Sequence, residues 1–208
     1  MTGQAVVLPA LWRPLVGLLV ASVVVMGSPG PSTISVTAVG AAYGFRRSLS
    51  YMSGLIAGTT AVLFAVAIGV VAILLSIQGG ASVLVTVSAV YILYLAFKIA
   101  TAPPLASRAG EVAAPAFGGG FLLAIANPKA YLAIAAVFAG SGSLFGDHAL
   151  DALAKTAILT VMIVLIHVCW LLAGASLSRM LHDPRRSRIV NVSLAASLVV
   201  MTAVALIG

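Results

Sequence analysis

Pro29-Gly30-Pro31 interrupts an apolar run long enough to cross a membrane, and Asn127-Pro128-Lys129 interrupts a second such run in the other half of the chain. Proline removes a backbone donor and clashes with the preceding helical turn, so the freed carbonyl groups need new partners in hydrocarbon. Breaks of this kind persist where they line a polar cavity. One break in each half is typical of an alternating-access carrier built from two repeats.

The composition is that of an integral membrane protein. The 208 residues are 62% hydrophobic and only 7% charged, and a helix needs about 20 apolar residues to cross a bilayer. We predict an all-α fold with a single transmembrane transporter domain over residues 1–208: repeat one at about 14–101, a loop at 102–116 and repeat two at about 117–207. Six transmembrane helices, of which the first and fourth are broken, can be placed at Pro14–Val36, Leu49–Ile77, Ala81–Ile99, Phe117–Gly140, Ala152–Leu177 and Ile189–Ile207.

The basic residues predict the orientation of these spans, because cytoplasmic loops are enriched in Lys and Arg. Both termini then lie outside, and the second triplet of spans is inverted relative to the first. An acidic loop with Asp147 and Asp151, followed by Lys155, is expected on the outer side. The net charge of +7 reflects topology rather than a nucleic-acid partner. Eight basic residues are expected to face the cytoplasm: Arg46, Arg47, Lys98, Arg108, Arg179, Arg185, Arg186 and Arg188.

Catalytic, redox and metal chemistry find little support in the sequence. The single cysteine, Cys169, lies inside the fifth span, which excludes a disulfide within the chain and a C-x-x-C site. Aspartate and histidine in the loops are too sparse for a metal site. We therefore predict no catalytic residue, no metal and no cofactor; the expected partners are a small-molecule substrate and the lipid bilayer.

The first break offers a candidate site for a carboxylate. A half-helix starting near Ser32 would direct its free amides and positive dipole end at a substrate, with the hydroxyls of Ser32 and Thr33 beside them. The residues of this candidate site are Pro29, Gly30, Pro31, Ser32 and Thr33. The alternative is a proline kink whose freed groups are satisfied by neighbouring helices.

Lys129 is the central candidate in the second break. It lies some twelve residues into its span, where burying a charge costs ~2.5–3.5 kcal/mol even on the lenient insertion scale. We expect it to anchor a substrate carboxylate or to exchange a proton, with Asn127 beside it and Pro128 making the break. The alternatives are a snorkelling lysine or one bonded to the carbonyls that Pro128 leaves free.

Further candidates lie near these breaks. His167 is the only histidine within a predicted span and, with a solution pKa of about 6.5, is a candidate for proton coupling; the alternative is a neutral histidine bonded between helices. Tyr131 and Trp170 either line the same cavity or pack. Small residues four apart, which let helix backbones approach closely, predict tight helix packing at Gly54 and Gly58 and at Gly40 and Gly44.

In this order, the motifs make the chain similar to the LysE/RhtB family of bacterial amino-acid exporters. The resemblance spans nearly the whole chain and implies a six-span carrier in the bacterial cytoplasmic (inner) membrane, driven by proton antiport. It rests on Pro29-Gly30-Pro31 followed by Gly40, Gly44, Arg46 and Arg47, on Asn127-Pro128-Lys129, and on Asp183-Pro184-Arg185-Arg186 followed by Asn191.

One position departs from the family pattern. Thr59 follows the Gly54 and Gly58 pair where many members of the family place an aspartate, and no predicted span contains Asp or Glu in its interior. A neutral or zwitterionic amino acid, or a derivative, is therefore the favoured substrate. Two alternatives stay open: an exporter of small anions or metal ions, and a membrane-embedded enzyme using Asn127, Lys129 and His167 on a lipid-borne substrate. The oligomeric state also stays open, and a homodimer is compatible with the sequence.

Overall fold

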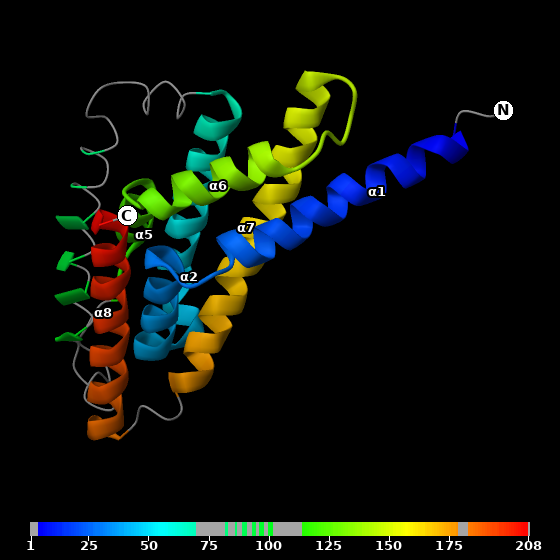
Figure 1. Ribbon diagram of the computed structural model, residues 1–208. Coiled ribbons are helices and arrows are strands. Elements are labelled where there is room, and N and C mark those ends of the chain that lie inside the picture. The colour runs from blue at the N-terminus through cyan, green and yellow to red at the C-terminus, as the bar shows by residue number, and fades with distance from the viewer. Residues whose placement is uncertain are drawn as a thin grey trace.

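All the regular secondary structure in the described residues is helical. This computed structural model describes residues 4–69, 82, 86, 89–90, 93–94, 96–97, 100–101, 114–178 and 183–207. In Figure 1, α2 lies at the centre, with α5, α6, α7 and α8 around it, and α1 extends away from this group toward the N-terminus. The helices are α1 (Gln4–Ala21), a π-helical turn η1 (Ser22–Met26), α2 (Pro31–Ala67), α5 (Phe117–Ile125), α6 (Pro128–Gly140), α7 (His148–Ser178) and α8 (Pro184–Ile207).

Helix α2 contains a reversal at Gly44. This residue has φ 75° and ψ 172°, a left-handed conformation that glycine adopts at no steric cost. The chain descends in blue before this point and returns in cyan (Figure 1). The Ser48 hydroxyl stabilises the turn by donating to the carbonyl oxygens of Gly44 at 2.6 Å and Val39 at 3.1 Å. The first predicted span thus continues to Tyr43, and Arg46 and Arg47 are exposed beside the turn, in the predicted loop.

By length and composition, two of the described helical segments could cross a membrane, namely Pro31–Ala67, which includes the Gly44 turn, and His148–Leu177; a third span is added if the pair α5 and α6, bent by 62°, is counted as one. The predicted sixth span is helical within α8. The predicted third span and the loop at 102–116 lie largely outside the described residues. The protein is therefore an all-helical membrane protein, while the count of six spans and the inverted repeat stay predictions.

Glycines allow α2 to approach its two main neighbours closely. A Cβ built on Gly54 would lie 2.0 Å from the Phe117 carbonyl oxygen of α5, and one on Gly58 would lie 2.8 Å from that of Phe121. The prediction of tight packing at this pair is confirmed. Gly40 packs in the same way against Leu171 of α7. Gly44 was wrongly included in the packing prediction: a Cβ there would have nothing within 4 Å, because the residue forms the turn.

We expect Gly120→Leu to weaken the α2–α5 contact strongly. A Cβ at Gly120 would lie 2.1 Å from the Tyr51 carbonyl oxygen, and overpacking of this kind costs about 1–3 kcal/mol. The thermal midpoint of the purified protein in detergent should fall by several degrees. Gly118→Leu is the matched control in the same helix, since its Cβ would meet nothing within 4 Å. Equal midpoints for the two variants would contradict the close contact.

The start of α7 corrects the prediction of an acidic loop. Helix α7 begins at His148, so Asp151 and Lys155 occupy consecutive turns and form an ion pair at 3.0 Å. Lys155 is only 5% exposed and donates to the Ser141 carbonyl oxygen at the end of α6. Asp151 accepts from the backbone N–H of Leu144. The four-residue spacing of the two charges places them on one helix face, where their hydrogen bonds stabilise the connection between α6 and α7.

Candidate functional site

Both predicted breaks are present, and each ends with a helix that restarts on proline. After η1 the chain is non-helical until Gly30, whose extended backbone precedes Pro31 at the start of α2. After α5, Asn127 has the same extended conformation and precedes Pro128 at the start of α6. Proline suits the first position of a helix because its missing N–H would have no partner there. The sequence thus interrupts both helices without losing a hydrogen bond at the restart.

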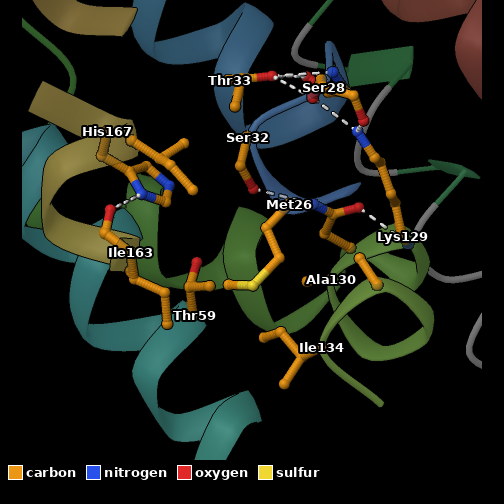
Figure 2. A pocket seen from close by; sticks show the side chains of 14 residues that line it. Met26, Ser28, Ser32, Thr33, Thr59, Lys129, Ala130, Ile134, Ile163 and His167 are labelled. Carbon is orange, nitrogen blue, oxygen red and sulfur yellow. Dashed lines mark hydrogen bonds between the residues drawn. The ribbon is translucent and has the colours of Figure 1, made fainter. Parts of the chain in front are cut away.

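The two breaks meet at one open cavity, seen from close by in Figure 2. Counted with its mouth and the open space there, it has an empty volume of about 430 Å³. Its lining comes from η1 and the first break, α2, the second break, α6 and α7. The lining residues are Met26, Ser28, Gly30, Ser32, Thr33, Thr59, Asn127, Lys129, Ala130, Ala133, Ile134, Ile163, Ile166 and His167.

Lys129 reaches from α6 across to the first break. Its Nζ donates to the Ser28 carbonyl oxygen at 2.6 Å, to the Ser28 hydroxyl at 2.7 Å and to the Pro29 carbonyl oxygen at 2.8 Å. The predicted alternative, a bond to carbonyls freed by Pro128, has the right chemistry but the wrong partner: the carbonyls belong to the other half of the chain. The ammonium group offsets its burial by satisfying the backbone of the first break.

Asn127 connects the starts of α2 and α6. Its side chain is 3% exposed, its Nδ2 donates to the Ser32 hydroxyl at 2.9 Å, and its Oδ1 accepts from the Lys129 N–H at 3.1 Å. These two bonds define the orientation of the amide, since one partner must accept and the other donate. On the other side of Ser32, the Thr33 hydroxyl accepts from the Gly30 N–H at 2.8 Å. Both breaks are therefore held in a fixed geometry relative to each other.

Thr59 and His167 also line the cavity, and each contributes one buried polar atom whose hydrogen bonding differs from that of Lys129 and Asn127. Thr59 is 6% exposed and His167 is 4% exposed. The Nδ1 of His167 lies 2.8 Å from the Ile163 carbonyl oxygen, one turn back in α7. Among the residues that the structure describes, neither His167 Nε2 nor Thr59 Oγ1 has a hydrogen-bond partner.

Other predicted site residues are placed outside the cavity lining. The three prolines, Pro29, Pro31 and Pro128, shape the backbone of the breaks. Tyr131 does not line the cavity, because its hydroxyl donates to the Ile125 carbonyl oxygen at the end of α5, at 2.9 Å. Trp170 likewise donates through Nε1 to the Gly27 carbonyl oxygen at 3.1 Å. For both residues the sequence left cavity lining and packing open, and in the structure both satisfy carbonyls next to a break.

Several lining residues were not predicted from the sequence, although helical spacing indicates them in retrospect. Ala133 follows Lys129 by one turn, and Ile163 precedes His167 by one turn, so each shares a face with a predicted residue. Ser28 is adjacent to the predicted break. Within the described residues, no three His, Cys, Asp or Glu side chains group as metal ligands. The lining can therefore bind a solute through one cation, hydroxyls, an amide and an imidazole.

Two broken helices that restart at a common cavity are typical of membrane translocators. The sequence profile of the LysE type translocator family matches residues 23–208, and the chain belongs to this family. Neither the curated proteins nor the solved structures compared with the chain give a match. This family is one of membrane transporters and not of enzymes.

Proposed function

We propose that this protein is a secondary-active exporter of a neutral or zwitterionic amino acid, or an amino-acid derivative, and that it works by proton antiport across the bacterial cytoplasmic membrane. The observation that supports this best is the contact of Lys129 with the first break, which brings the one cation of the cavity lining to the point where both broken helices restart. The family supports export of amino acids or related solutes.

The substrate carboxylate would exchange places with the backbone oxygens that Lys129 now holds. A carboxylate is a stronger acceptor for an ammonium group than a neutral carbonyl, so it displaces Ser28 and Pro29 from Nζ. Ser32 and Asn127, at the adjoining helix starts, would complete the carboxylate site. Releasing the first break from Lys129 also loosens the connection between the two halves, which permits one to rock against the other.

A neutral or zwitterionic substrate follows from the charges of the lining. All four acidic residues of the chain, Glu111, Asp147, Asp151 and Asp183, lie outside the interiors of the predicted spans. A cationic side chain would enter a cavity whose lining holds a lysine and no carboxylate, at a large desolvation cost. A small zwitterion brings its own counter-charge.

The wider arrangement follows the same proposal. Residues 1–208 form a single domain in which two inverted repeats of three spans, at about 14–101 and 117–207, move relative to each other. Both termini lie outside the cell, because Arg46 and Arg47 at the Gly44 turn mark the cytoplasmic side. The transport partner is the amino acid alone; no nucleic acid is involved.

Uptake of a labelled amino-acid panel into inverted membrane vesicles tests this function. With an acidic vesicle lumen, vesicles that contain the protein should accumulate at least one neutral amino acid above the level in vesicles without it. Dissipating the proton gradient should abolish the accumulation. Uptake of small anions but of no amino acid would support the second candidate, an anion exporter, which the single lysine of the lining favours. No transport by correctly inserted protein would overturn the proposal.

We expect Gly30→Ala to reduce transport without unfolding the protein. A Cβ at this position would lie 2.6 Å from Lys129 Cδ and 2.9 Å from Nζ, while the extended backbone, with φ −171°, accepts alanine without strain. The lysine must therefore shift from its three acceptors, and the rate in the vesicle assay should fall several-fold. Gly17→Ala, where the Cβ meets nothing within 4 Å, is the control and should leave the rate unchanged. Equal rates would contradict the close approach.

A further inference from the structure

We infer that Thr59 and His167 form a subsite for the ammonium group of the substrate, separate from the carboxylate site at Lys129. This inference rests on the proposed function, and it assigns a substrate group to two side chains that the carboxylate site does not use. In Figure 2, His167 and Thr59 lie toward one side of the cavity, and Lys129 lies toward the other.

The hydrogen bond of His167 to its own helix determines what its other ring nitrogen offers. A backbone carbonyl oxygen only accepts hydrogen bonds, so the contact of Nδ1 with Ile163 at 2.8 Å places the proton on Nδ1. In the neutral ring, Nε2 then presents a lone pair and acts as an acceptor. An ammonium N–H is a matching donor for this atom.

Thr59 adds a second acceptor from α2. Its hydroxyl oxygen, like His167 Nε2, is fully buried and has no partner among the described residues. Buried polar atoms are rarely left unsatisfied, least of all within a membrane. Because both residues line the same cavity, a solute in that cavity can satisfy both atoms at once, and a solute with several N–H donors does so best.

The apolar part of the lining explains why this subsite suits the ammonium group of a zwitterion rather than a cation that carries no negative charge of its own. Ala130, Ile134 and Ile163 line the cavity and belong to one buried apolar cluster, and they offer no counter-charge. An ammonium group bound at Thr59 and His167 therefore needs a negative charge within the same molecule, which Lys129 receives at the first break. The arrangement selects molecules that carry both groups.

The test compares solutes with and without the ammonium group in proteoliposomes that contain the full-length protein. Unlabelled L-alanine, propionate and N-acetyl-L-alanine, and the corresponding L-leucine set, compete for uptake of the best labelled amino acid of the panel. Wild-type protein should bind each amino acid at least about tenfold more tightly than its analogues. Thr59→Val and His167→Phe should each reduce that preference several-fold, and the affinity for propionate and 4-methylpentanoate should stay the same.

Control variants separate the subsite from general damage. Thr60→Val removes a neighbouring buried hydroxyl that has no partner in the described structure and does not line the cavity, so it should keep the full preference. His167→Gln restores an acceptor and should recover part of it if His167→Phe folds poorly. Transport of amino acids with an unchanged preference in Thr59→Val and His167→Phe would overturn the subsite alone. If these variants lost affinity equally for the amino acids and for the carboxylic acids without an ammonium group, the two side chains would hold a water molecule or serve packing. That result would also overturn the subsite. Absence of amino-acid transport in the wild type would instead refute the proposed function.

Discussion

Replacing Lys129 with alanine is expected to lower the transport rate by about 10- to 100-fold. A hydrogen bond to a charged group contributes about 1.5–3 kcal/mol, and the substrate carboxylate loses this partner in the variant. The substitution also leaves the carbonyl oxygens of Ser28 and Pro29 without the ammonium group that now satisfies them. Initial rates of gradient-driven uptake into inverted vesicles, normalised to inserted protein, measure the effect.

Two further variants distinguish the lost charge from a damaged fold. Lys129→Arg keeps a cation and several donors, so the thermal midpoint should stay near that of the wild type while transport recovers in part, since the guanidinium has another shape. Leu132→Ala, in the same helix, is the control: this side chain is 62% exposed and does not line the cavity. An alanine variant at Lys129 that exports at the full rate would remove the central residue of the mechanism.

The breaks were predictable from the sequence because their cause is local. Proline acts on its own helix turn, so Pro31 and Pro128 indicate where α2 and α6 restart before any tertiary contact is known. Gly54 and Gly58 predict close packing for a similar reason, since small residues four apart share one face of a helix. Membrane insertion itself follows from composition.

The connection between the breaks was not predictable, because it depends on residues far apart in the chain. Lys129 lies 101 residues from Ser28, and the sequence alone suggested bonds to carbonyls of its own break. Tyr131 was a candidate for either cavity lining or packing, and it packs, because residues two apart in a helix point to different faces. Lys155 was predicted to follow the acidic loop at the start of the fifth span, and its burial could not be foreseen because it depends on Asp151 and the end of α6.

The differences between the roles predicted from the sequence and the contacts in the structure follow one physical rule. In hydrocarbon every freed backbone group needs a partner, and this protein supplies those partners from side chains for which the sequence left both a cavity role and a structural role open. Lys129, Tyr131 and Trp170 all donate to carbonyls beside a break. Thr59 and His167 differ from them, because the structure shows no partner for their free atoms among the described residues.

Replacing His167 with phenylalanine is expected to abolish proton-driven accumulation while exchange of labelled for unlabelled amino acid continues at saturating concentration. Only His167 and Lys129 titrate among the residues that line the cavity, and Lys129 is occupied by the first break or by the substrate carboxylate. The Nε2 lone pair can hold either a proton or an ammonium N–H, so the two exclude each other at this atom. Antiport requires this exclusion, because the protein then carries the substrate in one direction of the cycle and a proton in the other.

The measurement is the accumulation ratio in proteoliposomes at a fixed pH difference. One pH unit stores about 1.4 kcal/mol per proton, which supports up to about a tenfold accumulation at one proton per substrate. Wild-type protein should approach that ratio, and His167→Phe should give a ratio of about one. His148→Phe replaces the exposed histidine at the start of α7 and should accumulate substrate as the wild type does. If the His167→Phe protein still accumulated substrate against its gradient, proton coupling would have to reside at Lys129 instead. Lys129 would then have to release its proton in order to leave the first break.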